Sequence, residues 1–218
     1  MDARELAAAL FRILETGDPF LAAEVVAPDN RNREAAVAPP ACAIPGPAGT
    51  LASGAWMRSA FSELRFPIIA FAEGGDQVWV RLRMRGRHTG PFVRFRNGRL
   101  AQAIPPTGRE IDFEQVHMVQ IRDGRVAGHE AVRDDMTMLA QLGVFPPAPA
   151  TALRMVAWRV SGRASRAAAE VTALAAGAAQ QLERVAAAAQ DQPAQSLEPV
   201  TRCRMTIHLS PAAGPVGP

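Results

Sequence analysis

The sequence predicts an α+β fold: a cone-shaped, curved antiparallel sheet packed by N-terminal helices and followed by a C-terminal Ala-rich helical extension. Three observations support this prediction. Apolar residues recur at helical spacing in the first 64 residues, and they alternate at strand spacing between residues 66 and 132. An Asp-Gly pair at residues 123–124 joins two of the alternating runs, which is a strong signal for a two-residue hairpin turn.

Three helices are expected before the sheet. They cover about residues 2–16, 18–26 and 48–64. Gly17 ends the first helix, and Asp18 is the N-cap of the second, with Pro19 in its first turn. Residues 28–47 contain five prolines and are expected to form a loop.

Strands follow the helices. The predicted strands cover residues 66–71, 77–85, 112–122 and 125–132. In the second strand, alternate apolar side chains point one way: Val78, Val80, Leu82 and Met84. Gly74-Gly75-Asp76 separates the first two strands, and Asp123-Gly124 joins the last two. A short helix over about residues 134–142 is expected to close the domain, because Gly143 ends it.

Residues 151–190 form a different unit, in which apolar residues step by three and four as in a long amphipathic helix. The stripe consists of Leu153, Val156, Val160, Ala164, Ala167, Val171, Leu174, Ala178, Leu182 and Val185. Two alternatives exist for such a helix. In the first, it packs on its own domain or frays into solvent; in the second, it pairs with a second chain as a coiled coil. The first alternative is favoured, because Ala buries little surface and Gly162 and Gly177 each cost about 1 kcal/mol of helix stability.

The chain is therefore expected to divide into a domain over residues 1–150 and an extension over residues 151–218. Beyond Pro193 the extension is rich in Pro and Gly and is predicted to be disordered. Its one strand-like run is short and consists of Cys203, Met205, Ile207 and Leu209. We expect a chain that ends at Pro149 to remain folded and to unfold cooperatively.

Composition excludes several classes of function. Apolar residues make up 48% and charged residues 21%, which is typical of a soluble globular chain. The net charge of +3 comes with no concentrated basic patch, which argues against nucleic-acid binding, and no apolar run is long enough for a membrane span. The N-terminus is typical of a helix rather than a signal peptide. Cys42 and Cys203 are isolated, so no disulfide framework or zinc site is expected, and a cytoplasmic location fits.

The register of the last hairpin predicts where chemistry takes place. A two-residue turn pairs Arg122 with Arg125, and regular pairing then places His117 opposite Glu130 and His129 on the other face. The following residues would share one face: His117, Val119, Ile121, Val126, Glu130, Val132 and Asp134. Its aliphatic members mark this face as buried, so an imidazole and two carboxylates would lie in an apolar concavity. Burial raises the pKa of a carboxylate, which makes it a candidate general base.

Structural explanations stand beside this hypothesis. Asp134 or Asp135 could be the N-cap of the helix that follows. His117 and Glu130 could be a structural cross-strand pair, and His88 could be a solvated turn residue. For each residue taken alone, the structural explanation is simpler than a functional one. Several such residues together on one face favour a functional site.

Several motifs together resemble one family. They are Arg85-Gly86-Arg87-His88-Thr89-Gly90, Ile104-Pro105-Pro106-Thr107-Gly108-Arg109, Ile121-Arg122-Asp123-Gly124-Arg125-Val126, Val132-Arg133-Asp134-Asp135 and Gln141-Leu142-Gly143. In their order and spacing, about residues 3–147 resemble the SnoaL-like polyketide (ester) cyclases of the nuclear-transport-factor-2-like superfamily. The resemblance implies a deep apolar cone and an Asp at its mouth that acts as general acid/base in an intramolecular aldol ring closure, without metal or cofactor. The position that matches this Asp is Asp134.

Two stretches depart from the family pattern. Gly128-His129-Glu130 stands where Glu-His-Trp is common, so Glu130 replaces a large aromatic residue. Asn32-Arg33-Glu34-Ala35 stands where Asn-His-Glu-Ala is frequent. Both departures place polar or charged groups near the expected pocket.

We therefore predict a cofactor-free cyclase or isomerase-type enzyme that acts on a small, mostly apolar carbonyl compound, such as a polyketide or an ester. Asp134 would abstract an acidic C–H proton, and His117 or His88 would position or polarise the carbonyl. The expected substrate-binding residues are Glu130, Trp56, Val119, Ile121 and Val132. The alternative is a non-catalytic protein of the same fold that binds a small molecule or a protein partner. An epoxide-hydrolase-like use is disfavoured, because the chain has no Tyr to help hold a water molecule.

A homodimer is expected through the outer face of the sheet. Trp79 alternates with Arg81, Arg83 and Arg85 on one face of its strand, and Trp and Arg are enriched at interface hot spots. Two alternatives stay open: the Arg stems cover Trp79 within the monomer, or these side chains line the mouth of the cone.

Overall fold

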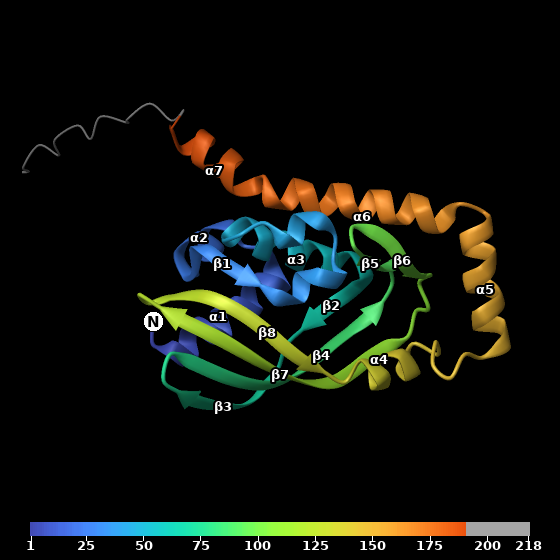
Figure 1. Ribbon diagram of the computed structural model, residues 1–218, viewed down its shortest axis with the longest axis horizontal. Helices are drawn as coiled ribbons and strands as arrows, with labels where there is room; N and C mark the ends of the chain where they lie inside the picture. Colours follow the sequence, from blue (N-terminus) through green and yellow to red (C-terminus); the bar gives the residue numbers. More distant parts are fainter. Residues whose placement is uncertain (191–218) are drawn as a thin grey trace, which may run out of the picture.

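A computed structural model describes residues 1–190 of the chain, and its centre is a curved six-stranded sheet (Figure 1). The strand order is β1-β8-β7-β4-β2, and β3 also pairs with β4. The strands are β1 (Val26–Asn32), β2 (Phe61–Arg65), β3 (Ile68–Gly74), β4 (Gln77–His88), β7 (Glu110–Arg122) and β8 (Arg125–Arg133). All neighbours are antiparallel except β1, which runs parallel to β8. The predicted α+β class is confirmed.

Three helices cover one face of this sheet: α1 (Ala3–Thr16), α2 (Pro19–Val25) and α3 (Pro47–Ala60) (Figure 1). The predicted boundary signals of the first two are confirmed. Gly17 adopts a left-handed φ of 74°, and the Asp18 carboxylate accepts hydrogen bonds from the N–H groups of Phe20 and Leu21. The core between helices and sheet includes Phe11, Leu51, Phe61, Leu82 and Phe113.

The structure differs from the prediction in three segments. Residues 28–47, predicted as a loop, contain most of β1 and two short 3-10 helices. These helices are η1 (Arg33–Val37) and η2 (Pro40–Ala43). The third helix ends at Ala60, because the chain continues as β2. A separate hairpin of β5 (Phe92–Arg96) and β6 (Arg99–Ile104) lies beside the main sheet, and neither of its strands is among the predicted strands.

A β-bulge in β8 decides which of its side chains face the helices. Ile121 pairs with Val126, as predicted. The next pair along the strands is Gln120 with Gly128, so Ala127 is an extra residue on β8. Because side chains alternate along a strand, every residue of β8 beyond this point changes face relative to regular pairing.

The predicted pairing of His117 with Glu130 is therefore wrong, and His117 pairs with Ala131 instead. His129, which was expected on the opposite face, is buried inside the domain. Glu130 and Val132 lie on the outer face, where Val132 is 68% exposed.

The domain closes with α4 (Asp135–Gln141), close to its predicted bounds. Its N-cap is Asp134, and Gly143 beyond it has a left-handed φ of 72°. None of the helices within the described residues 1–190 is long and apolar enough to span a membrane.

The extension is helical, and its middle helix packs on the domain. It consists of α5 (Pro149–Val160), α6 (Arg163–Ala179) and α7 (Gln181–Gln190), and α6 lies along α3 and also touches β5 and β6 (Figure 1). The buried residues of α6 are Ala164, Ala167, Ala168, Val171, Ala175 and Ala179. Leu153, Val156 and Val160 of α5 are exposed. The run from Cys203 to Leu209 and the rest of the tail lie outside the described residues.

Two matched substitutions test the packing of α6. Ala175 is fully buried, so Ala175→Leu should lower the free energy of unfolding by about 1–3 kcal/mol through overpacking. Ala173 is exposed, so Ala173→Leu should change it by less than about 0.5 kcal/mol. Urea unfolding measures both, and equal stabilities would show that α6 does not pack there.

The independent folding of residues 1–149 stays a prediction, with a lower Tm expected for the truncated chain.

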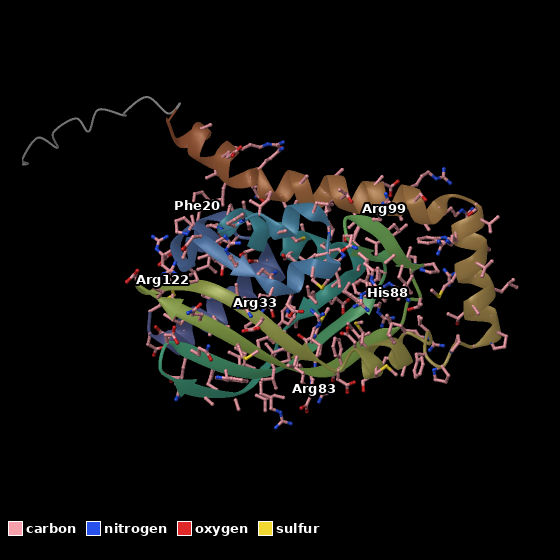
Figure 2. The ribbon with its side chains drawn as sticks, viewed as in Figure 1. Phe20, Arg33, Arg83, His88, Arg99 and Arg122 are labelled. Atoms are coloured by element: carbon pink, nitrogen blue, oxygen red, sulfur yellow. The ribbon has the colours of Figure 1, made fainter. Side chains whose placement is uncertain are left out.

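The homodimer also stays a prediction. Trp79 is 41% exposed on the outer face, beside Met118 and Ala72 on the neighbouring strands. Arg83 on the same face points away from the helices (Figure 2). Sedimentation equilibrium should give about twice the chain mass, and Trp79→Ala should shift the equilibrium toward the monomer. A wild-type protein that stays monomeric at tens of micromolar would contradict this expectation.

Candidate active site

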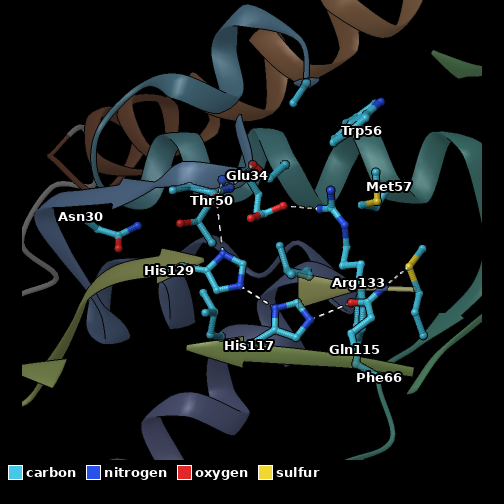
Figure 3. Close-up of a pocket in the computed structure, with 16 residues that line it drawn as sticks. Asn30, Glu34, Thr50, Trp56, Met57, Phe66, Gln115, His117, His129 and Arg133 are labelled. Carbon is cyan, nitrogen blue, oxygen red and sulfur yellow. Dashed lines mark hydrogen bonds and ion pairs between the residues drawn. The ribbon is translucent and has the colours of Figure 1, made fainter. Parts of the chain in front are cut away.

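A cavity of about 80 Å³ lies between α1, α3 and β1 and the inner face of β7 and β8 (Figure 3). The helices α1 and α3 contribute mainly apolar side chains to its lining, together with Thr50 and Ser53 of α3. Most of the other polar side chains come from β1, β7 and β8 and from η1. The lining residues are Leu10, Leu14, Asn30, Asn32, Glu34, Ala38, Thr50, Ser53, Trp56, Met57, Phe66, Met84, Gln115, His117, His129 and Arg133.

Two buried histidines form a hydrogen-bonded chain along the sheet side of the cavity (Figure 3). His117 Nδ1 on β7 is 2.8 Å from His129 Nε2 on β8. At one end of the chain, His117 Nε2 is 2.7 Å from Gln115 Oε1. At the other end, His129 Nδ1 is 3.1 Å from Asn32 Oδ1. The chain therefore connects three adjacent strands, β7, β8 and β1.

The number of protons in this chain is constrained. Its three contacts each need one hydrogen, whereas two neutral imidazoles carry only two N–H groups. Asn32 Oδ1 is an acceptor, because it also accepts a hydrogen bond from the Glu34 N–H at 3.0 Å. All three contacts are satisfied either when the pair holds one additional proton or when the Gln115 amide turns so that its nitrogen donates to His117.

Burial favours the neutral pair. Loss of solvation, reinforced by the positive charge of Arg133, lowers the pKa of His129 to about 4. Loss of solvation also lowers the pKa of His117 well below its usual value, and His129 and Arg133 add to this effect. With both rings neutral, Gln115 donates to His117, which donates to His129, which donates to Asn32.

Arg133 and Glu34 form the charged part of the cavity (Figure 3). Arg133 Nη1 is 2.5 Å from Glu34 Oε2, and Glu34 Oε1 accepts a hydrogen bond from the Ala131 N–H at 3.0 Å. Only 26% of the Arg133 side chain and 20% of the Glu34 side chain are exposed, so their attraction is screened less than that of a surface pair. Glu34 is the only carboxylate among the sixteen described residues that line this cavity.

Asp134 and His88, two of the predicted catalytic residues, do not line this cavity. Asp134 is exposed, and its carboxylate accepts hydrogen bonds from the N–H of Thr137 at 3.0 Å and from its hydroxyl at 2.6 Å, which lowers the pKa of Asp134. This is the geometry of a helix cap. His88 is fully buried rather than solvated, with its Nδ1 3.0 Å from Thr107 Oγ1. Burial, reinforced by Arg154, lowers the pKa of His88 to about 4.

Trp56 and His117 are the predicted residues that do line the cavity. The Trp56 indole is held in place because its N–H donates to the Val93 carbonyl at 3.0 Å. The predicted substrate contacts that do not line it are Glu130, Val119, Ile121 and Val132. Val119 and Ile121 pack in or against the core. Glu130 and Val132 lie on the outer face because of the bulge. Within residues 1–190, no three His, Cys, Asp or Glu side chains cluster as a metal site would require.

Most of the polar lining could not be recognised from the sequence. The prediction places His129 on the wrong face, and it does not single out Gln115 or Arg133 as site residues. It does place the stretch from Asn32 to Ala35 near the pocket, and Asn32 and Glu34 line it. Gly128, next to the extra residue of the bulge, is a weak local signal, since glycine inside a strand often marks a bulge.

The curved sheet, the helices across it and the cavity between them together define an α+β cone of the nuclear-transport-factor-2-like class. A family model described as SnoaL-like polyketide cyclase matches residues 4–142. The chain therefore belongs to the SnoaL-like polyketide cyclase family. The match ends before α5, so the helical extension has no part in it.

Individual relatives agree with this assignment. Aklanonic acid methyl ester cyclase DauD of Streptomyces sp. (strain C5) is 33% identical over 105 residues, which cover 48% of this chain and 60% of DauD. Nogalonic acid methyl ester cyclase of Streptomyces nogalater is 36% identical over 89 residues, which cover 40% of this chain and 60% of that enzyme. The chain thus spans about three fifths of the length of these curated relatives. The structure of TsrD from Streptomyces laurentii shares the fold, with a TM-score of 0.53, 24% identity and coverage of 66% of this chain and 98% of TsrD.

Acidification should destabilise the fold through its buried histidines. The pKa of His129 is about 4 in the folded chain against 6.5 for a solvated imidazole, so the unfolded chain takes up a proton first as the pH falls. The contribution of this residue is complete above about pH 6.5 and should fall by about 2 kcal/mol at pH 5. Urea unfolding above about pH 6.5 and at pH 5 measures this loss of unfolding free energy.

His129→Gln should weaken the pH dependence, whereas Glu130→Gln on the outer face should leave it unchanged. An identical pH dependence in wild type and His129→Gln would contradict the buried, neutral state of His129.

Proposed function

We propose that this protein is a cofactor-free cyclase that closes a ring in a polyketide- or ester-like carbonyl compound, with Glu34 as general acid/base. One observation carries the proposal: a carboxylate and a guanidinium form an ion pair inside a mainly apolar cavity. Relatives named as methyl ester cyclases support the reaction class. The proposal keeps the carboxylate mechanism expected from the sequence and assigns it to Glu34 rather than Asp134.

The ion pair suits proton abstraction next to a carbonyl group. A substrate carbonyl oxygen that binds Arg133 would loosen the Arg133–Glu34 pair and free the carboxylate. Glu34 then removes the acidic C–H proton, and the negative charge that develops on the enolate oxygen is stabilised by the guanidinium of Arg133. Low exposure of both groups strengthens this stabilisation.

Ring closure then follows without any further reactant. The enolate carbon attacks a second carbonyl carbon of the same molecule, which forms the new C–C bond and converts that carbonyl oxygen to an alkoxide. The alkoxide takes back the proton from the Glu34 carboxylic acid. The product is an isomer of the substrate, and Glu34 regains its charge and its ion pair with Arg133.

His117 is a positioning residue in this proposal rather than a group that polarises the substrate. Both of its ring nitrogens are engaged by protein groups, Gln115 and His129. The histidine chain also holds Asn32 through His129. The Asn32 Oδ1 in turn accepts a hydrogen bond from the backbone N–H of Glu34. It therefore fixes the segment that carries the proposed base.

The test compares three carboxylate variants on aklanonic acid methyl ester, the substrate type named for the relatives. Glu34→Gln should lower kcat by about 10²–10⁴-fold and leave the Kd of the compound within a few-fold, because a general acid/base acts mainly on the transition state. Asp134→Asn should retain turnover, since Asn also caps a helix. Glu24→Gln on the exposed side of α2 is the matched control.

Loss of turnover in Asp134→Asn with Glu34→Gln still active would overturn the assignment of the base. Binding without turnover in every variant, wild type included, would favour the non-catalytic alternative.

A further inference from the structure

A groove of about 430 Å³ lies between the β5–β6 hairpin and the helical extension. One wall is β6, and the other consists of α5 and the first turn of α6. The lining residues are Leu100, Ala101, Gln102, Ala103, Met155, Val156, Arg159, Ala164 and Ser165. None of them lines the cavity that holds Glu34, and the family match ends before α5. The groove is therefore a feature of the extension and separate from the proposed active site.

The groove follows the edge of β6. Side chains of a strand alternate between its two faces, whereas four consecutive residues of β6, from 100 to 103, line the groove. Consecutive residues line the same groove only where it meets the strand from the edge. The other edge of β6 pairs with β5, and within residues 1–190 no further backbone hydrogen bond engages this stretch. Its outer N–H and C=O groups can therefore pair with an added strand.

The helix α5 stands beside this edge without closing it (Figure 1). A helix that protects a sheet edge packs directly against it. Here the groove separates β6 from Met155 and Val156, and the Val156 side chain is 58% exposed. A volume of about 430 Å³ lies within the range of ligand-binding sites. The space can therefore hold a short extended segment, which would cover Val156.

The groove is positively charged. Arg159 is the one charged residue among its nine described lining residues, and Arg99 and Arg163 directly precede the lining stretches of β6 and α6. All three side chains are exposed, and none forms an ion pair within residues 1–190. By contrast, the four arginines of β4 between residues 81 and 87 all pair with carboxylates of β7. The charge around the groove thus favours an anionic partner.

The start of α6 has the same polarity. Gly162 is its N-cap, no side chain caps its first N–H groups, and its first turn contains no acidic residue. Such N–H groups and the positive end of the helix dipole attract a carboxylate. Ala164 and Ser165 place this helix end in the same groove as Arg159.

We propose that this groove is a docking site for an extended, acidic segment of another protein, which adds to the β5–β6 hairpin as a third strand. The backbone of the segment pairs with the outer edge of β6 between Leu100 and Ala103. Its apolar side chains cover Met155 and Val156, and its carboxylates lie at Arg159 and the start of α6. This interaction goes beyond ring closure and does not depend on it.

Four synthetic hexapeptides test the site by isothermal titration calorimetry with the full chain. The acidic probe is acetyl-Thr-Val-Glu-Val-Glu-Thr-amide, and the basic probe carries Lys in place of both Glu. The basic probe should bind about fivefold more weakly or not at all. The other two are acidic probes that are N-methylated either at both Val or at both Glu. Because the N–H groups of a strand point alternately to its two edges, only one of these two should lose binding.

Two variants of the protein locate the binding. Arg159→Glu should weaken the acidic probe by about fivefold or more and strengthen the basic probe. Arg184→Glu, exposed on α7 outside the groove, is the matched control and should change neither. Ser165→Trp should fill the groove and weaken both probes, whereas Ala173→Trp on the exposed face of α6 should not.

Several results would overturn the proposal. They are no binding of the acidic probe to wild type, equal or tighter binding of the basic probe, equal affinities of the two N-methylated probes, and effects of Arg159→Glu and Ser165→Trp no larger than those of their controls. A shift of either variant toward the monomer in sedimentation equilibrium would assign the groove to a second copy of the chain and would overturn it as well.

The outcome is separable from that of the proposed function. Glu34→Gln should bind the acidic probe as tightly as wild type does, because the groove and the cavity share no lining residue. Arg159→Glu should in turn leave ring closure unchanged.

Discussion

The β-bulge at Ala127 is the constraint on which the cavity depends. It changes the alternation of β8 after Val126, so that His129 and Arg133 face the helices while Glu130 faces outward. With regular pairing, the inner face would carry Glu130 in place of His129, and the ion pair between Arg133 and Glu34 could not form inside the domain. One extra residue in one strand therefore determines the polar groups of the site.

The edge strand β1 and the 3-10 helix η1 after it supply three further polar residues of the lining: Asn30, Asn32 and Glu34. The strand β1 runs parallel to β8, with Asn32 opposite His129, and η1 follows it directly. This arrangement brings Glu34 over the backbone of Ala131 and next to Arg133. The histidine chain, the ion pair and the bulge thus form one connected unit, which explains why the cavity holds a carboxylate that comes from outside the strands of the last hairpin.

Much of the fold could be predicted from the sequence, because its signals are local. The Asp18-Pro19 helix start, the alternation in β4 and the Asp123-Gly124 turn each specify their own element. The site could not be predicted in the same way. A bulge at Ala127 leaves little trace in the residue pattern, and β1 contains Pro28 and polar residues that a loop also prefers. The role of Glu34 depends on contacts with residues about 97 positions away, which no local pattern reveals.

The state of the His129 imidazole tests this account most directly. Nitrogen-15 NMR of the side chain, followed from about pH 8 to pH 5, separates a buried ring from a solvated one. We expect His129 to stay neutral over this range and to keep its hydrogen on Nδ1, the nitrogen that faces Asn32. A His129 that titrates near the ordinary pKa of about 6.5 would place it on the outer face, and the bulge, the histidine chain and the site built on them would be wrong.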